Sequence, residues 1–577
     1  MVPHNNEIRD ILNQVADLLE IKGENQFRVR AYREAARIIE GMTEQASRMV
    51  KEEKDLTDYR GIGKDMAGKI REIVEAGTLS QLEQLKAEVP LSLLDLMKIP
   101  SLGPRKISHI YNKLGLTTLE GLEKSAREGK IADLNGFGEK TQQNILESLG
   151  RIKKSGAKRL LWSDAAPFAD ALEEYLSGVE GVRRIKVAGS YRRGKETVGD
   201  LDILATCRRG TEHDLMKSFV SYEGVKNVSA HGKTKSSVIL RSGLQVDLRI
   251  VAGVSYGAAL HYFTGSKAHN IAVRKLGIEQ GFKINEYGVY KGEKRIAGKT
   301  EKEVYESVGL VYIEPELREN LGEIEAAEDN RLPRLAKRSD IRGDLHCHTR
   351  RTDGHGSLEE MAEAAKALGY GYLAITEHSR KVAIAGGLNE KELRVHIQNI
   401  DKVNQNLRGI RLLKGIEVDI LPDGSLDLDD SVLKELDLVV GSVHYQQRLS
   451  RKKQTERIIR AMDNPNLDIL GHPTARLINT RDPMDINLEK IIEAAKERNV
   501  VIELNAQPDR LDLPHNYCKT AAELGVKIAL STDAHSAENL SLMENGIIEA
   551  RRGWLSKDDI INTRPLKELL KMLRRNA

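Results

Sequence analysis

The sequence has few cysteines, no long apolar run and almost no net charge. Its 577 residues include only three cysteines, too few for a disulfide framework, and they form no C-x-x-C zinc motif. No window approaches the roughly 18 apolar residues of a membrane span, and the first residues, MVPHNNEIRD, contain no apolar signal core. We therefore expect a cytoplasmic protein without membrane contact.

The near-zero net charge hides an uneven distribution. The chain carries 90 Lys and Arg against 86 Asp and Glu, a formal net charge of +4. Residues 151–300 contain 27 basic and 15 acidic side chains, an excess of 12, whereas residues 1–150 and 339–577 each have a net charge of −2. Such a local excess can neutralise phosphates, although a charge bias alone is more often a solvated surface.

The length predicts about four domains, and the hydrophobic period changes along the chain. Apolar residues recur at helical spacing in residues 8–21 and 31–42, and residues 5–150 as a whole are predicted to be helical. From about residue 182, runs such as DLDILATC and LQVDLRIV predict strands, and residues 316–338 are polar and charged, as in a linker. Beyond them, seven β-rich runs alternate with amphipathic helices, which predicts a parallel, barrel-like sheet.

Three glycine-containing turns interrupt the helical region. They are Gly61-Ile62-Gly63-Lys64, Leu102-Gly103-Pro104-Arg105 and Gly136-Phe137-Gly138-Glu139. Each precedes a helical run, and glycine allows backbone N–H groups and a helix N-terminus to face a phosphate oxygen. The turns resemble helix-hairpin-helix motifs, so we favour sequence-independent DNA binding over plain helix connections. The expected contacts are Gly61, Gly63, Lys64, Gly103, Arg105, Gly136 and Gly138.

Three carboxylates on predicted strands point to a two-metal site. Asp200 and Asp202 are residues i and i+2 of one strand and project to the same face, and Asp247 lies in a second alternating strand. Neighbouring carboxylates repel unless cations neutralise them, which indicates Mg²⁺ or Mn²⁺. Two such ions can activate a nucleophilic oxygen and stabilise a leaving phosphate. Upstream, a Gly-Ser turn with Arg193 offers N–H groups, a hydroxyl and a guanidinium to a triphosphate.

These motifs closely resemble those of family X DNA polymerases, of the DNA polymerase beta type, over roughly residues 1–315. Besides GSYRRG, GDLD and VDLR, the resemblance includes the turn YFTGS at residues 262–266 and GFKINEY at residues 281–287. It implies that Asp200, Asp202 and Asp247 bind the catalytic metals and that Asp247 also activates the primer 3′-hydroxyl. It further implies nucleotide-binding roles for Gly189, Ser190, Arg193, Gly199, Tyr262, Phe263, Gly265, Asn270 and Arg274.

The N-terminal region also resembles the lyase domain of that family, through AYREAA at residues 31–36 and GIGKDMAGKI at residues 61–70. Lys69 occupies the position of the Schiff-base nucleophile that removes a 5′-deoxyribose phosphate. A lysine with that role needs its pKa lowered by burial or by a cationic neighbour. A solvated helix lysine is an equally weighted reading, and Asp65 stands where relatives often carry a supporting lysine.

The C-terminal part of the chain concentrates histidine and carboxylate residues at the ends of its predicted strands. Loops of a βα barrel converge at the strand C-termini, where residues far apart in sequence meet. Six histidines with three carboxylates in that pattern are hard to explain by packing, and mixed imidazole and carboxylate ligands suit Zn²⁺, Mn²⁺ or Fe²⁺. The candidates are His346, His348, Asp353, His378, Glu417, His444, His472, Asp533 and His535.

Residues 339–577 resemble the polymerase-and-histidinol-phosphatase (PHP) domain, a metal-dependent phosphoesterase, with all nine of its ligand positions present. The resemblance implies up to three ions: one at His346, His348, Glu417 and Asp533; a second at His444 and His472, bridged by Glu417; and a third at Asp353, His378 and His535. Because some relatives have lost ligands and activity whereas this chain has not, we expect a working site.

The combined expectation is a multidomain polymerase. It has all-α helix-hairpin-helix domains at 1–88 and 89–155, an α+β palm at 156–252 and thumb at 253–315, a linker at 316–338 and a (β/α)7 barrel at 339–577. It would fill short gaps in DNA repair, with gapped or primer-template DNA and dNTPs as partners, as a monomer by default. The barrel would be a 3′–5′ exonuclease, also acting at abasic or blocked 3′ ends.

Two alternatives remain open at this point. One is a nucleotidyltransferase for a non-DNA acceptor fused to a small-molecule phosphatase, against which the helix-hairpin-helix turns argue. The other is a DNA-end-binding scaffold with silent sites, against which the intact ligand sets argue.

Overall fold

The structure is a computed structural model that describes residues 5–42, 46–59, 61–90, 92–97, 99, 102–139, 141–143, 145–146, 149 and 159–573. It divides into two compact units, Met1–Lys158 and Arg159–Ala577, each of which we describe by itself. Among the described residues, no helix combines the length and the apolar composition that crossing a bilayer requires.

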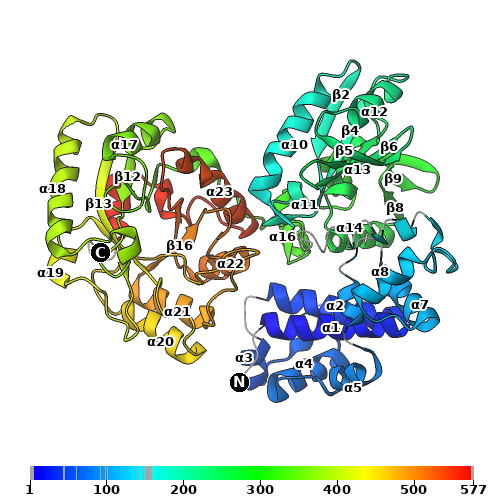
Figure 1. Cartoon of the computed structure of the whole chain (residues 1–577), viewed down its shortest axis with the longest axis horizontal. Helices are drawn as coiled ribbons and strands as arrows, with labels where there is room; N and C mark the ends of the chain where they lie inside the picture. The colour runs from blue at the N-terminus through cyan, green and yellow to red at the C-terminus, as the bar shows by residue number, and fades with distance from the viewer. Residues whose placement is uncertain are drawn as a thin grey trace. The chain divides into compact units, whose positions relative to one another are not determined.

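The first unit is helical, as predicted (Figure 1). Helices α1 and α2 cover the two segments with helical apolar spacing and bury Ile8, Leu12, Tyr32 and Ile39 in one core. The elements are α1 (Asn5–Lys22), α2 (Gln26–Gly41), α3 (Ala46–Lys51), η1 (Leu56–Asp58), α4 (Lys64–Ala76), α5 (Ser80–Glu88), α6 (Leu93–Leu96), α7 (Pro104–Leu114) and α8 (Leu119–Arg127).

The second unit begins with a five-stranded sheet in the order β2-β4-β7-β6-β5, in which β4 and β7 are parallel neighbours. Alternating residues of β4 and β7, such as Leu201, Ile203, Val246 and Leu248, enter the core beneath α10 and α12. The elements are β1 (Leu160–Leu161), α10 (Trp162–Ser177), β2 (Val182–Val187), α11 (Gly189–Arg192), β3 (Thr197–Val198), β4 (Asp200–Cys207), α12 (Glu212–Val220), β5 (Val225–His231), β6 (Lys235–Leu240) and β7 (Gln245–Ile250).

A second subdomain follows, with three helices and a three-stranded antiparallel sheet in the order β10-β9-β8. It contains α13 (Tyr256–Thr264), α14 (Lys267–Glu279), β8 (Phe282–Asn285), β9 (Gly288–Lys291), β10 (Lys294–Ala297) and α15 (Glu301–Glu306). The segment predicted as a linker comes next and is packed, because η2 (Pro315–Leu317) and α16 (Glu323–Glu328) bury Leu317, Arg318, Glu323 and Ile324. It connects the two parts of the unit as folded structure and not as an extended chain.

The C-terminal part confirms the predicted seven-stranded barrel. Strands β11 (Gly343–Asp344), β12 (Tyr372–Ile375), β13 (Arg411–Asp419), β14 (Leu438–Ser442), β15 (Ile469–Leu470), β16 (Val501–Asn505) and β17 (Ile528–Ser531) are parallel and adjacent in chain order. A bridge between Cys347 and Ala534, just beyond the first and last strands, nearly closes the sheet. Helices surround the strands in Figure 1: α17 (Leu358–Ala367), α18 (Glu390–Asn406), α19 (Asp430–Leu433), α20 (Arg451–Ala461), α21 (Leu488–Arg498), α22 (His515–Leu524) and α23 (Met543–Arg552).

Strand alternation sorts the barrel residues into two apolar layers. In β12, Tyr372 and Ala374 belong to the inner cluster, whereas Leu373 and Ile375 belong to the cluster that includes the helices. Helix α24 (Leu566–Met572) adds Leu569 to the inner cluster. Because Tyr372, the first residue of β12, donates to the Arg564 carbonyl at 3.0 Å, α24 covers the N-terminal ends of the strands. The C-terminal ends carry the polar residues.

Two candidate metal centres

The three predicted palm carboxylates lie together at one edge of the first sheet. Asp202 on β4 is the register partner of Asp247 on β7, and Asp200 lies two residues earlier on the same strand face. Burial, with the charges of Asp200 and Asp247, raises the pKa of Asp202 to about 6. Burial and Asp247 also raise the pKa of Asp200. Three carboxylates gathered at one edge of a sheet suit a site for divalent cations.

The Gly-Ser turn is fixed directly against these carboxylates. Gly189 begins α11 with φ +65°, and a Cβ built on it would lie 2.8 Å from Asp202 Oδ2, so only glycine fits. The Ala188 N–H donates to the Asp202 carbonyl at 2.7 Å. A Cβ at Gly199 would lie 2.7 Å from Arg159 Nη1. The backbone around Ser190 is therefore held beside the carboxylate edge, as triphosphate binding requires.

Arg193 bridges the Gly-Ser turn to the second subdomain. Its Nε donates to Glu319 Oε1 at 2.9 Å, and its Nη1 donates to the Thr264 carbonyl. A Cβ at Gly265 would approach the same Nη1 to 3.1 Å. The guanidinium is thus only partly exposed and is paired with a carboxylate.

Beside Arg193, Arg192 enters a buried ion network that the sequence analysis did not find. Arg192 Nη2 lies 2.7 Å from Glu301 Oε2, and Arg318 Nη1 lies 2.6 Å from Glu301 Oε1. Burial would raise the pKa of Glu301, but Arg318 and Arg192 outweigh it and lower that pKa to about 2. The network ties the Gly-Ser turn to α15 and to the segment after it.

The aromatic turn gathers the remaining predicted nucleotide-binding residues. The rings of Tyr262 and Phe263 meet edge to face with centroids 5.1 Å apart. Arg274 Cζ lies 5.7 Å from the Tyr262 ring, and Asn270 Nδ2 donates to the Tyr262 carbonyl at 2.7 Å. Arg249 Cζ, two residues after Asp247, lies 4.7 Å from the Phe263 ring. Aromatic rings and guanidinium groups therefore lie together, with Phe263 next to the strand that carries Asp247.

In the first unit, the three glycine turns lie at or near helix starts. Gly63 and Gly103 are the N-cap residues of α4 and α7, and neither helix has a side-chain cap. Lys64 and Arg105 stand at the first and second helical positions. At the third turn Gly136 has φ +85° and Gly138 has φ +64°. Helix N-termini without a side-chain cap leave N–H groups available to a phosphate.

Lys69 has surroundings unlike those of an activated amine. Its Nζ lies 2.5 Å from Asp65 Oδ2 and 5.0 Å from the Tyr32 ring centroid. Burial would lower the pKa of Lys69, but Asp65 and Tyr32 outweigh it and raise the pKa. In this structure the amine is a paired cation, so a Schiff-base role requires Asp65 to be displaced or neutralised.

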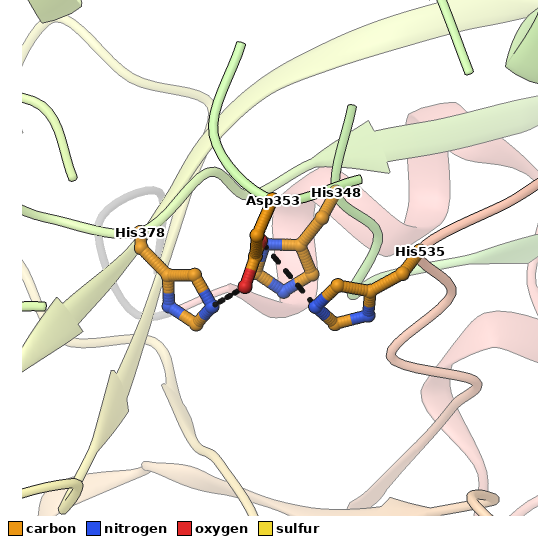
Figure 2. Close-up of side chains that lie close together, drawn as sticks. All are labelled: His348, Asp353, His378 and His535. Carbon is orange, nitrogen blue, oxygen red and sulfur yellow. Dashed lines mark ion pairs between the residues drawn. The ribbon is translucent and has the colours of Figure 1, made fainter. Parts of the chain in front are cut away.

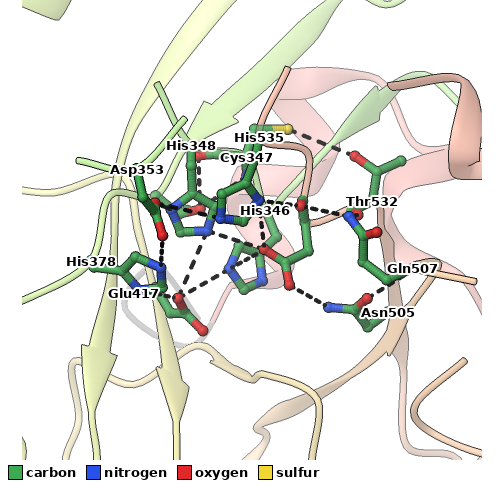
Figure 3. A network of polar contacts seen from close by, with 12 residues as sticks. His346, Cys347, His348, Asp353, His378, Glu417, Asn505, Gln507, Thr532 and His535 are labelled. Atoms are coloured by element: carbon green, nitrogen blue, oxygen red, sulfur yellow. Dashed lines mark hydrogen bonds and ion pairs between the residues drawn. The ribbon is translucent and has the colours of Figure 1, made fainter. Parts of the chain in front are cut away.

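The nine predicted barrel residues converge at the C-terminal ends of the strands, around Glu417. Figure 3 shows His346, His348, Asp353, His378 and His535 gathered about it. Glu417 Oε1 lies 2.9 Å from His472 Nε2 and 3.2 Å from His444 Nε2. Glu417 Oε2 lies 2.8 Å from His378 Nδ1 and 3.5 Å from His346 Nε2. The Glu417 carboxylate therefore lies among four of the predicted histidines and contacts them through both of its oxygens.

Two groups of potential ligands flank Glu417. On one side, His346 and His348 lie with Asp533, whose Oδ1 is 3.2 Å from His348 Nε2. On the other, Asp353 lies 3.2 Å from His378 Nε2 and 3.4 Å from His535 Nε2 (Figure 2). His348 also reaches this second group, and His378 also groups with Glu417 and His444. The groups thus share His348 and His378, whereas the predicted assignment gave each histidine to a single ion.

The buried polar atoms of this cluster test whether the residues suit metal ions. Among the described residues, His346 Nε2, His348 Nε2, His378 Nδ1 and Glu417 Oε2 are buried and lie within ion-pair distance of an oppositely charged group, but none of these contacts has hydrogen-bond geometry. Burying so many polar atoms without hydrogen bonds in one place costs free energy unless a bound ion or ligand contacts them. The donor set of imidazole and carboxylate groups fits Zn²⁺, Mn²⁺ or Fe²⁺.

Electrostatics supports the same reading. Burial would lower the pKa of His378, but Glu417 and Asp353 outweigh it and raise the pKa to about 10. Burial would raise the pKa of Glu417, but its surrounding histidines, His444 first, hold it well below the usual range. His348, in contrast, has its pKa lowered to about 4 by burial. The carboxylates are therefore ionised and concentrate negative charge among ligand nitrogens.

Further carboxylates contact the histidines at their other ring nitrogens or at a backbone N–H group, and the sequence analysis missed them. Glu503 Oε1 lies 2.7 Å from His346 Nδ1, and Glu503 Oε2 accepts from the His472 N–H at 2.7 Å. Asp419 Oδ2 lies 3.8 Å from His444 Nδ1. Asn505 Nδ2 donates to Asp533 Oδ2 at 3.1 Å. The available signal was a charged or amide residue at the end of an otherwise apolar strand, as in VVIELN.

Comparison with known families matches five stretches of the chain, from the N-terminal helices to the barrel. The matching family models are the helix-hairpin-helix domain at 3–79, the SAM-like helix-hairpin-helix tandem at 93–151, the DNA polymerase beta palm at 163–249, the DNA polymerase beta thumb at 259–319 and the PHP domain at 344–507.

One curated relative covers the whole chain, and two others each cover part of it. The chain is 39% identical over 580 residues to the DNA polymerase/3'-5' exonuclease PolX of Bacillus subtilis (strain 168), covering 99% of this chain and 100% of that protein. DNA polymerase lambda of Arabidopsis thaliana is 27% identical over 54% of this chain and 62% of its own length. A probable phosphatase of Thermoanaerobacter sp. (strain X514) is 32% identical over 40% of this chain and 95% of its own length. The chain belongs to family X of the DNA polymerases, in the group whose members carry a C-terminal PHP domain.

Proposed function

We propose that this family X polymerase fills short gaps during DNA repair and that its PHP domain removes nucleotides from 3′ ends. The observation that carries the polymerase half is the packing of the Gly189 turn against Asp202, in register with Asp247. The relative from Bacillus subtilis is named for both activities, and the one from Arabidopsis thaliana is a polymerase of the same family.

In the polymerase site, we assign Asp200, Asp202 and Asp247 to divalent ions. Such ions activate the attacking oxygen and neutralise the leaving phosphate. The chain's own groups orient the reactants: the N–H groups of the Gly189–Ser190 turn and the Arg193 guanidinium face the triphosphate. Asp247 accepts the proton of the primer 3′-hydroxyl, the 3′-oxygen bonds to the α-phosphorus, and pyrophosphate departs.

Nucleotide selection is assigned to the aromatic turn. Tyr262 and Phe263, with Asn270 and Arg274, line the pocket for the nascent base pair, and Gly265 keeps the turn close to Arg193. The helix starts near Gly61, Gly63, Lys64, Gly103, Arg105, Gly136 and Gly138 hold the DNA backbone by N–H groups. Lys69 gives a lyase activity that its pairing with Asp65 restrains.

In the barrel, His346, His348, Asp353, His378, Glu417, His444, His472, Asp533 and His535 hold up to three ions of Mn²⁺, Zn²⁺ or Fe²⁺. Glu503 and Asp419 fix the orientation of the rings of His346 and His444. We infer a cytoplasmic monomer acting on gapped or primer-template DNA, with the domain boundaries of the sequence analysis except that residues 316–338 are packed structure and not a linker.

A one-nucleotide gap assay tests this proposal. We expect full-length protein with Mg²⁺ or Mn²⁺ to add one nucleotide to a gapped duplex when dNTPs are present. With Mn²⁺ and no dNTPs, it should shorten the same primer from its 3′ end. Failure to extend the primer with either metal would refute the polymerase half, and an unshortened primer would refute the nuclease half.

The second candidate function is a small-molecule phosphatase activity of the barrel. The probable phosphatase of Thermoanaerobacter sp. supports it, because 95% of the length of that protein aligns with this chain. Comparing hydrolysis of a sugar phosphate with that of a 3′-recessed duplex decides between the two. A kcat/KM higher on the sugar phosphate would favour this candidate.

A further inference from the structure

An aromatic side chain next to the barrel cluster is held out toward solvent. Tyr445 follows His444 directly and is 48% exposed, whereas the His444 side chain is 22% exposed and faces Glu417. Single exposed apolar residues are common and need no explanation. The surroundings of Tyr445 distinguish it. Its backbone carbonyl is hydrogen-bonded by a buried arginine, and a lysine ammonium group lies over its ring.

A buried arginine fixes the backbone of Tyr445. Arg457 on α20 is only 2% exposed, and its Nη1 donates to the Tyr445 carbonyl at 2.9 Å. The same guanidinium donates through Nε to the carbonyls of Ile420 and Leu421, each at 3.0 Å. A buried charge bonded to several carbonyls makes the segment rigid. The Tyr445 ring therefore projects from a fixed base.

The loop that follows His378 places the ammonium group of Lys381 over the Tyr445 ring. Lys381 Nζ lies 5.0 Å from the Tyr445 ring centroid. The loop leaves the cluster after His378 and returns to it, because the Leu388 N–H donates to the His378 carbonyl at 2.8 Å. The Lys381 N–H is itself anchored by Asp427 Oδ2 at 2.9 Å. Ring and ammonium group thus both lie a few residues from predicted metal ligands.

We propose that Tyr445 stacks against the terminal base of the DNA strand that the barrel degrades and that Lys381 binds a phosphate of that strand. Aromatic stacking beside a basic group is the general way in which proteins hold single strands without reading sequence. The pair would place the terminal phosphodiester at the cluster whatever the base. This inference rests on the proposed nuclease function and adds the residues that position its substrate.

The test compares two single-stranded substrates with full-length protein and Mn²⁺. One ends in a 3′-thymidine, and the other ends in a 3′-tetrahydrofuran residue, which keeps the phosphodiester and lacks the base. Tyr445→Ala should lower kcat/KM on the thymidine end by about 5-fold to about 150-fold, the range for losing one base–aromatic stack. It should lower kcat/KM on the tetrahydrofuran end by less than about twofold, since no stack is lost there.

Further variants separate binding from folding. Tyr445→Phe keeps the ring and should restore the rate on thymidine, while Lys381→Ala should raise KM on both substrates. Leu368→Ala is the matched control, because Leu368 is 40% exposed and lies before the N-terminal end of β12, at the opposite end of the barrel. Bound metal, measured by mass spectrometry, should be equal in all variants.

Two results would overturn the inference. Equal losses on both substrates with Tyr445→Ala would mean that the residue only supports the cluster, and unchanged rates on both would mean that no base is stacked. A wild-type protein that degrades neither substrate would refute the proposed nuclease function itself, and this inference with it. A loss confined to the thymidine end supports both.

Discussion

Glu503 offers a direct test of how the histidines of the barrel cluster are oriented, because each of its two oxygens contacts one of them. Oε1 lies 2.7 Å from His346 Nδ1, and Oε2 accepts from the His472 N–H at 2.7 Å. The carboxylate thereby fixes the tautomer of His346 that leaves Nε2 facing Glu417. The isosteric change Glu503→Gln keeps the volume of the side chain but supplies only one acceptor oxygen.

The expected loss of metal affinity follows from the number of acceptor oxygens that remain. In Glu503→Gln, either His346 Nδ1–H or the His472 N–H must face an NH₂ group, so one hydrogen bond to a charged acceptor is lost. Such bonds contribute about 1.5–3 kcal/mol, which is roughly a 10-fold to 150-fold change in an equilibrium constant. Loss of a residue that hydrogen-bonds to a metal ligand typically weakens metal binding by about 10-fold to 100-fold. We therefore expect metal affinity of the barrel to fall by one to two orders of magnitude.

The assay is an Mn²⁺ titration of 3′-end degradation in metal-stripped protein. The half-saturating Mn²⁺ concentration should rise by about 10-fold to 100-fold, while the rate at saturating Mn²⁺ and the gap-filling rate stay near wild type. Glu497→Gln is the matched control, since its side chain is 73% exposed on the barrel surface. An unchanged titration curve for Glu503→Gln would refute the argument that this carboxylate orients a metal ligand.

Two further predictions concern the other sites. Since burial and its neighbours raise the pKa of Asp202 to about 6, the ionised group destabilises the metal-free fold above that pH. Asp202→Asn should stabilise EDTA-treated protein at pH 7.5 by about 2 kcal/mol, and thermal melts should show the gain vanishing near pH 4; an equal gain at both pH values would contradict this. Asp65→Asn should lower the pKa of Lys69 and increase borohydride trapping of a 5′-deoxyribose phosphate end, which Lys69→Ala abolishes; unchanged trapping with Asp65→Asn would show that the ion pair is irrelevant.

Local pattern was sufficient to predict the architecture of the barrel. Most of the seven strands lie in short apolar runs that a helix follows, and this alternation can be read from the local sequence. The candidate ligands could be named for a related reason, because they lie at or after the C-terminal ends of strands whose neighbours are in chain order. Strand β5 was missed because it is the edge strand of its sheet, and most of its side chains are exposed.

Partner choice was not predictable from local pattern. Arg192, Glu301 and Arg318 form one ion network although more than 100 residues separate the first from the second. The same pairing explains why the polar segment after residue 315 is packed: Arg318 is buried because Glu301 neutralises it. Composition shows charged residues in that segment, but only the tertiary fold shows which of them are paired.

The central claim is that one chain carries two separate metal-dependent sites for DNA, and reciprocal variants test it most directly. Asp200→Ala with Asp202→Ala should abolish gap filling and leave 3′-end degradation intact. His346→Ala with His348→Ala should abolish degradation and leave gap filling intact. If either pair eliminated both activities in protein that remains folded by circular dichroism, the two-site account would be contradicted.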